Sequence, residues 1–280
     1  IIGGFSVGSL GWLDVDGEYL QYPPFFYDAI LPIWLLTTSV FLLVGIPFLS
    51  MFILGLRILS SNVRKVSKPT SLVLLGIWVV ALLTIIFTGL DFGTSHSNYS
   101  KTTQRNSLNL IESDTLKIMA VNDDTLYYRH NLRRTTDKEE VEVNGKKMAY
   151  SNFVKVDVKK SNSNENYIVI QKKSRGKTKS KAKQNAKKIQ YKYNIVNNTL
   201  VLDAYFLSEY KNLWKDEEVK VTFYITENTT VYFDNSIKNF LYKVDNEQNM
   251  YDKEMGKHYF IMTDKTLKCT DCKVHKEKST

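Results

Sequence analysis

The sequence predicts a membrane-anchored all-β protein, in which membrane-spanning helices precede a β-rich domain with one inserted amphipathic α-helix. Three observations support this fold class. Two long runs without a charged residue lie within residues 29–90, separated by a basic loop. Beyond them, apolar and polar residues alternate with period two, which is typical of strands. One lysine-rich stretch interrupts this alternation and has apolar residues at helical spacing instead.

The two uncharged runs, residues 29–56 and 71–90, are each long enough to cross a membrane. About 20 apolar residues span the hydrocarbon core as a helix. Two buried helices of a soluble protein are the alternative, but the length of the runs and their lack of charge favour membrane spans. Pro47 lies inside the first run and should kink it, so the backbone group that it leaves unpaired needs another partner.

The charges around the runs predict their orientation. The loop 57–70 carries four Lys or Arg residues and no acid, whereas residues 14–28 carry four acids and no base. Because short loops rich in Lys and Arg stay in the cytoplasm, we expect the loop inside, and residues 14–28 and everything after Asp91 outside. Residues 1–13 are too short to span and are interpreted as the tail of an earlier span, in a chain that is a fragment.

Residues 107–272 are predicted to form a β-rich domain outside the membrane, after a polar linker at 91–106 and before a tail at 273–280. Many short alternating segments separated by turn residues indicate this class. An Asn144-Gly145 pair predicts a hairpin turn between two of them. The strand candidates are 115–121, 125–129, 153–160, 166–172, 198–206, 219–225, 229–234 and 258–263.

The lysine-rich stretch lies between two strand candidates. Ala182, Ala186 and Ile189 are spaced as on one face of a helix, and Thr178 or Ser180 would cap its start. The simplest interpretation is a helix whose lysines face water, and the same face suits an anionic lipid, a polysaccharide or an acidic partner. Nucleic acid is not expected, because the stretch lacks aromatic residues for base stacking. Its cations are Lys172, Lys173, Arg175, Lys177, Lys179, Lys181, Lys183, Lys187 and Lys188.

The two cysteines, Cys269 and Cys272, form a C-x-x-C pair. A local disulfide or thiol pair that closes the end of the domain, a silent pair, and a redox or metal role are the alternatives. His275 is the one nearby addition, which is too few ligands for a structural zinc site. Acidic clusters at 137–140 and 216–218 are interpreted as solvated surface. Because no catalytic motif occurs, we expect no enzyme, no cofactor and no metal.

Several sequence segments resemble those of PspC-domain (phage-shock-protein C) membrane proteins of Bacteroidota. "GIPFLSMFILGLRIL", the basic loop and "LLGIWVVALL" resemble their paired membrane helices. "KKSRGKTKSKAKQNAKKIQYKYNIVNNTLVLDAYF", "WKDEEVKVTFYITENTTVYFD" and "FIMTDKTLKCTDC" resemble their C-terminal toastrack domain. The resemblance implies a β-helix-like domain, the bacterial inner membrane with this domain in the periplasm, and an upstream PspC domain that is missing from this sequence. It offers no catalytic residues.

The resemblance also implies a function, which is envelope-stress regulation. The leading hypothesis is a non-enzymatic sensor or adaptor that acts through protein contacts of its β domain. Envelope or stress-response proteins, membrane lipids and a second copy of the chain are the expected partners. The alternative is that the domain binds an anionic glycan or lipid through the basic helix Lys172–Lys188.

Overall fold

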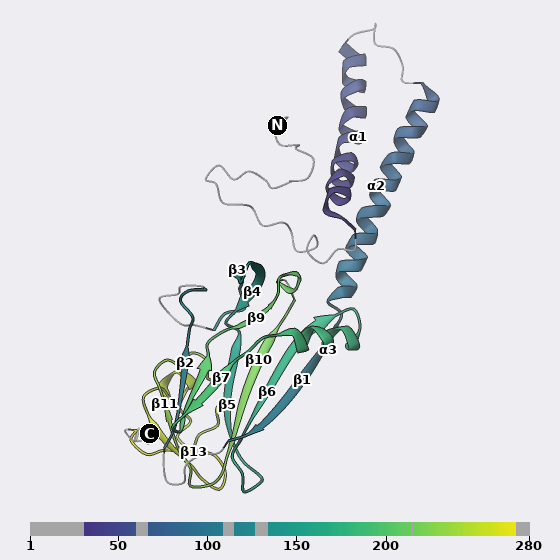
Figure 1. Ribbon diagram of the computed structural model, residues 1–280. Coiled ribbons are helices and arrows are strands. Elements are labelled where there is room, and N and C mark those ends of the chain that lie inside the picture. The colour runs from purple at the N-terminus through teal and green to yellow at the C-terminus, as the bar shows by residue number, and fades with distance from the viewer. Residues whose placement is uncertain (1–30, 60–66, 109–114, 127–133, 214, 273–280) are drawn as a thin grey trace, which may run out of the picture. The chain divides into compact units, whose positions relative to one another are not determined.

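The computed structural model describes residues 31–59, 67–108, 115–126, 134–213 and 215–272 (Figure 1). The chain divides into two compact units, Ile1–Ser97 and Asn98–Thr280, and each is described by itself. Several predicted features lie outside the described residues: the segments 1–13, 14–28 and 273–280 with His275, residues 60–66 of the basic loop, and 127–129 of one strand candidate.

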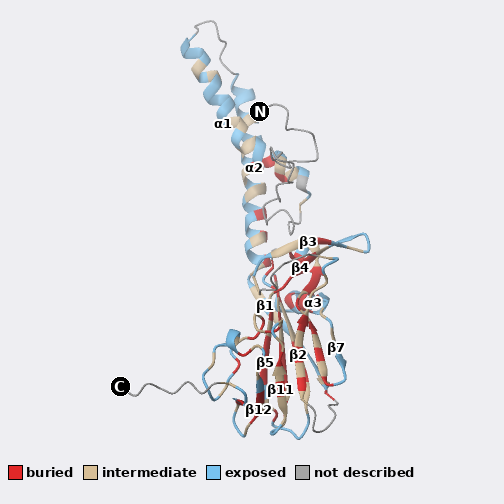
Figure 2. Ribbon diagram, turned by 90° about the vertical axis from the view of Figure 1, so that its left-hand side faces the viewer, coloured by how far each residue is buried: buried red, intermediate tan, exposed pale blue. Residues whose placement is uncertain are grey.

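Two long helices form the described part of the first unit, α1 (Ile33–Leu59) and α2 (Lys68–Ser95). Both are long and apolar enough to cross a membrane. Many of their large apolar residues are exposed, as expected for helices that face lipid. Both helices are coloured mostly as exposed or intermediate in Figure 2. The hydroxyl of Ser67 caps α2 by accepting a hydrogen bond from the backbone N–H of Thr70. Helix α1 is shifted a few residues beyond the predicted run, and α2 extends its run at both ends.

Pro47 lies inside α1 and cannot donate the hydrogen bond that the carbonyl of Leu43, one turn earlier, would accept. The indole Nε1 of Trp78 in α2 donates to that carbonyl instead, at 3.0 Å. The unpaired backbone group predicted from the sequence is therefore satisfied by the neighbouring helix. This bond also links α1 to α2.

Three sheets form the second unit, with the strand orders β1-β6-β10-β5, β13-β12-β11-β2-β8-β7 and β3-β4-β9. The strands are β1 Asn98–Ser107, β2 Leu116–Val121, β3 Lys138–Val143, β4 Lys146–Ser151, β5 Val154–Lys160, β6 Tyr167–Gly176, β7 Tyr193–Val196, β8 Thr199–Asp203, β9 Phe206–Glu209, β10 Glu218–Ile225, β11 Thr230–Phe233, β12 Tyr259–Met262 and β13 Leu267–Cys269. The helices are α3 Lys179–Lys188 and the 3-10 turns η3 Tyr210–Asn212 and η4 Asp252–Glu254.

Among the described strands, three pairs of strands that are far apart in the chain run parallel: β5 with β10, β2 with β8, and β2 with β11. Parallel pairs of this kind arise when successive coils stack on one another, as in a β-helix. The predicted fold class, a membrane-anchored β-rich protein with one inserted α-helix, is confirmed.

The core of the second unit joins the inner faces of the two larger sheets in one apolar cluster. Buried residues run along their strands in Figure 2. The alternation predicted for β5 and β10 is confirmed, because Val154 and Val156 are buried opposite Val219 and Val221. Each such side chain contributes on the order of 1.5–3 kcal/mol by leaving water. The hairpin turn is also confirmed, with φ positive at Asn144 and Gly145.

Three segments differ from the sequence-based expectation. The described start of the strand candidate 125–129 is a turn, in which the backbone N–H of Leu126 donates to the carbonyl of Asp123. Residues 198–206 form two strands instead of one, because the chain leaves the second sheet after β8 and joins the third sheet as β9. Residues 91–106 are the last turns of α2 and most of β1 instead of a linker. The sequence of β1 is almost wholly polar and therefore gave no alternation signal; its antiparallel pairing along the full length of β6 holds it in the sheet.

Candidate functional sites

Helix α3 is held against β6 and β1 by a small apolar face. Ala182, Ala186 and Ile189 are buried, as the sequence predicted, and Asn185 is buried beside them. Thr178 caps the helix through its side-chain hydroxyl, which confirms one of the two predicted caps. This face leaves the long cationic side chains on the remaining surface.

The junction between β6 and α3 requires a glycine. A Cβ added to Gly176 would lie 2.6 Å from the backbone nitrogen of Ala182, which cannot shift without moving the helix. Immediately before it, the carbonyl of Arg175 accepts a hydrogen bond from Nδ2 of Asn185 at 2.8 Å. These contacts fix where the basic surface of α3 lies relative to the sheet.

Several of the nine predicted cations have structural partners. Burial lowers the pKa of Lys172, whose ammonium stabilises the carboxyl end of α3. Lys173 lies over the ring of Tyr99, 5.2 Å from its centroid. Lys172 Nζ donates a hydrogen bond to the carbonyl of Ile189 at 2.8 Å. Two more of the cations form ion pairs, Arg175 with Asp216 at 2.6 Å and Lys188 with Glu209 at 2.7 Å.

The remaining cations, Lys177, Lys179, Lys181, Lys183 and Lys187, are exposed. Lys179, Lys183 and Lys187 are four residues apart and therefore line one side of α3; we call them the outer lysine row. Among the described residues, none of these three makes an ion pair. Like charges at this spacing repel one another, so a bound anion would stabilise the row.

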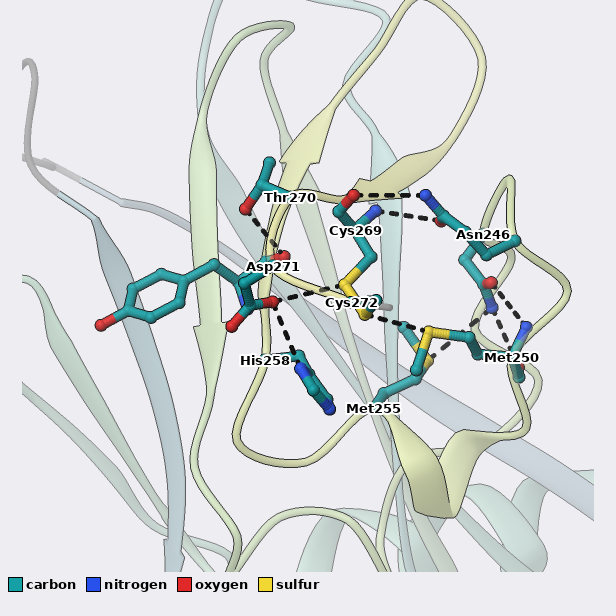
Figure 3. The surroundings of a disulfide bond; sticks show 10 residues. Asn246, Met250, Met255, His258, Cys269, Thr270, Asp271 and Cys272 are labelled. Carbon is teal, nitrogen blue, oxygen red and sulfur yellow. Dashed lines mark hydrogen bonds and ion pairs between the residues drawn. A yellow bond between two sulfur atoms is a disulfide. The ribbon is translucent and has the colours of Figure 1, made fainter. Parts of the chain in front are cut away.

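The C-terminal strands hold a second cluster, shown in Figure 3. A disulfide joins Cys269 to Cys272, with Cα atoms 5.7 Å apart. Cys269 ends β13, and its backbone N–H and carbonyl both bond the side-chain amide of Gln248, at 3.0 and 3.2 Å. The sulfur of Met250 lies 3.3 Å from Sγ of Cys272.

Two further side chains, those of Asp271 and His258, lie close to this disulfide. Asp271 Oδ1 lies 3.4 Å from Sγ of Cys269 and 3.2 Å from Nδ1 of His258 (Figure 3). It also accepts a hydrogen bond from the backbone N–H of Tyr259 at 3.0 Å. His258 is the first residue of the strand candidate 258–263, and the sequence alone predicted no role for it. Only the pairing of β12 with β13 brings it there.

A buried ion pair is the third polar feature, and it corrects the interpretation of 216–218 as solvated surface. Lys138 Nζ lies 2.8 Å from Oε2 of Glu217, with side chains 7% and 0% exposed. Lys138 also donates to the carbonyl of Asn212, and Ser174 donates to Oε1 of Glu217. Burial lowers the pKa of Lys138, and Glu217 opposes that shift. A cavity of about 500 Å³ opens beside the pair.

Two protein families match the chain. Residues 1–96 match the PspC transmembrane region, and residues 141–276 match the toastrack domain found in some PspC proteins. The chain belongs to the PspC-type membrane proteins that carry a toastrack domain. These matches confirm the resemblance drawn from the sequence. One family describes the membrane region and the other describes the toastrack domain. None of the curated proteins or solved structures compared with the chain matches it.

Proposed function

We propose that this PspC-type chain is a non-enzymatic sensor or adaptor of envelope stress in the bacterial inner membrane. Its toastrack domain lies in the periplasm and binds a partner protein, and its helices transmit the bound state. The family supports the stress-related membrane role, and the basic loop supports the orientation. The main support for partner binding is an open sheet edge with exposed apolar side chains.

That edge is β7, the outer strand of the six-stranded sheet. The described part of the chain supplies no strand beyond it. Ile195 and Val196 on β7 are 36% and 51% exposed. The backbone N–H of Ile195 bonds the side chain of its neighbour Asn194 at 2.8 Å. An edge strand of this kind can pair with an extended peptide, which adds one more strand to the sheet. The occupant is therefore an extended apolar segment of an envelope or stress-response protein.

Cross-linking in cells tests this edge. A photoreactive residue replaces Asn194 in the full chain, and adducts are compared with and without envelope stress. We expect a stress-dependent adduct that is lost in the double variant Ile195→Lys/Val196→Lys, because charges on an edge prevent strand addition. It should persist in Asn164→Lys, which adds charge in the exposed turn before β6. An adduct of twice the chain mass would identify a second copy as the occupant. A fully folded domain without any stress-dependent adduct would contradict the proposal.

The basic helix supports a second function, binding of an anionic surface such as phospholipid headgroups or acidic glycan. Its outer lysine row is exposed, and among the described residues none of its three lysines makes an ion pair. Asn98 pairs with Gly176 and donates to the carbonyl of Lys177 at 2.7 Å, next to the start of α3. These contacts hold the start of α3 against β1 and β6, so the outer lysine row has a fixed place on the β unit.

Vesicle binding tests this second function. The full chain in zwitterionic nanodiscs is mixed with vesicles that contain phosphatidylglycerol, and binding is measured by flotation. We expect binding that falls steeply with salt and weakens in Lys179→Gln/Lys183→Gln/Lys187→Gln. The matched control Lys253→Gln/Lys257→Gln/Lys265→Gln removes the same charge from exposed positions elsewhere and should bind as the parent does. Equal losses of vesicle binding in both variants would show that binding depends only on the net charge of the domain. Helix α3 would then not be a specific binding site.

A further inference from the structure

The strands β12 and β13 bring together four side chains that no single stretch of sequence contains. Their antiparallel register pairs Phe260 with Cys269, and the same register continued outward sets His258 opposite Asp271. Cys272 follows one residue later. The geometry therefore gathers an imidazole, a carboxylate and two sulfurs at one end of the sheet (Figure 3).

The donor atoms of His258, Cys269, Asp271 and Cys272 all lie within 4.8 Å of one another. A tetrahedral zinc ion, with bonds of about 2.0–2.3 Å, sets its ligands roughly 3.3–3.8 Å apart. The observed contacts approach this spacing: Asp271 Oδ1 is 3.2 Å from His258 Nδ1 and 3.4 Å from Cys269 Sγ. The side chains of His258 and Asp271 are 35% and 40% exposed, so an ion can reach them from solvent.

The groups behind these donors hold two of them in place. Gln248 bonds both backbone groups of Cys269, and the backbone N–H of Tyr259 bonds the carboxylate of Asp271. Such supporting contacts orient the ligands of metal sites. The disulfide closes a loop of only four residues and so adds little stability through chain entropy. Opening it should leave the surrounding sheet intact.

We propose that reduction of the Cys269–Cys272 disulfide converts this cluster into a Zn²⁺ site with two thiolates, one imidazole and one carboxylate as ligands. A dithiol reductant delivers two electrons and two protons, which break the S–S bond and leave two thiols while the reductant becomes a disulfide. Zn²⁺ then replaces one proton on each thiol, so loading releases two protons. The disulfide and the metal are mutually exclusive states of the same sulfurs. This proposal departs from the sequence-based expectation of no metal.

The donor set selects the metal. Two thiolates with an imidazole and a carboxylate match the borderline preference of Zn²⁺. The thioether of Met250, beside Cys272, would instead serve a softer ion such as Cu⁺. The dependence of binding on His258 and Asp271, or on Met250, therefore distinguishes the two ions.

The test uses the full chain in detergent micelles, reduced anaerobically with a phosphine, which adds no competing thiol. Thiol counting checks the reduction, and Co²⁺ is the spectroscopic probe. We expect one Co²⁺ per reduced chain, with the thiolate charge-transfer absorption of a tetrahedral site, no binding to the oxidised chain, and displacement by Zn²⁺. His258→Gln and Asp271→Asn should each weaken Zn²⁺ binding at least about tenfold. His96→Gln and Asp264→Asn are matched controls from other parts of the chain and should bind as the parent does.

Three results would overturn the proposal. The first is a disulfide that resists reduction while the chain stays folded. The second is a reduced chain without the cobalt absorption. The third is binding that survives both His258→Gln and Asp271→Asn; if it is then lost in Met250→Leu, the site belongs to a soft monovalent ion instead of Zn²⁺. Circular dichroism of each variant confirms that the β unit remains folded.

Discussion

At the residue scale, Asp203 at the end of β8 should make the stability of the β unit depend on pH. Burial raises the pKa of its carboxyl to about 6; Lys192 opposes this shift and Asp123 adds to it. The folded state therefore holds a proton that the unfolded chain releases, and the stability this provides is lost as the pH rises from about 4 to about 6. Asp203→Asn should leave stability unchanged at about pH 4. At about pH 7 it should raise the free energy of unfolding by on the order of 1 kcal/mol, a figure that allows for partial exposure.

Denaturant unfolding of the full chain in detergent at both pH values measures this difference. Asp264→Asn, at an exposed position between β12 and β13, is the matched control and should show no such pH dependence. A gain for Asp203→Asn of the same size at both pH values would assign the effect to packing and not to ionisation.

The buried Lys138–Glu217 pair leads to a second prediction at this scale. Lys138→Met leaves the carboxylate of Glu217 buried without its cation, which should lower the free energy of unfolding by about 3–5 kcal/mol. The double variant Lys138→Met/Glu217→Gln should recover most of that loss, because it removes both charges and keeps an acceptor for Ser174. Lys160→Met breaks a more exposed pair with Glu227 and should cost less than about 1 kcal/mol. No recovery in the double variant would mean that Lys138 acts through its packing instead.

At the element scale, the contact between α1 and α2 should depend on the proline in α1. Trp78→Phe leaves the carbonyl of Leu43 without a donor and should weaken helix pairing by about 1 kcal/mol. In Pro47→Ala the new backbone N–H satisfies the same carbonyl, so Trp78→Phe should then cost clearly less. Steric trapping in micelles measures the pairing of the two helices in the parent, in each single variant and in the double variant, which together form a double-mutant cycle. Trp34→Phe, at an exposed tryptophan of the same spans, is the control. Additive costs would show that the indole and the proline act separately.

The elements differ in how far the sequence predicts them, and β1 and β5 show why. The valines of β5 face one apolar core, so their alternation in the sequence identifies the strand before any partner is known. Strand β1 has no apolar face, and only its long-range pairing with β6 makes it a strand. The same limit applies to the sites. Helical spacing revealed the buried face of α3, whereas the contact between His258 and Asp271 depends on the register of β12 with β13, which residue types alone do not determine.

At the scale of the whole molecule, the orientation in the membrane decides which partners the chain can meet. The basic segment 57–70, which includes the end of α1 and the start of α2, contains Arg57, Arg64, Lys65 and Lys68 and no acid. This charge should keep the segment in the cytoplasm and place the toastrack domain in the periplasm. In spheroplasts, an impermeant maleimide applied after mild reduction should label Cys269 and Cys272, and external protease should remove the domain. A disulfide at these cysteines is also what an oxidising compartment permits.

The charges of the loop, and not the total charge of the chain, should set this orientation. Replacing the four basic residues of the loop with Gln should yield a mixed population, part labelled and part protected. The variant Lys253→Gln/Lys257→Gln/Lys265→Gln removes charge far from both spans and should keep a single orientation, because residues distant from the membrane contribute little. Protection of the parent chain from both reagents would contradict the prediction. The outer lysine row would then face the cytoplasm, where anionic inner-leaflet lipids and nucleic acid are the available partners and reduced, metal-loaded cysteines are the expected state.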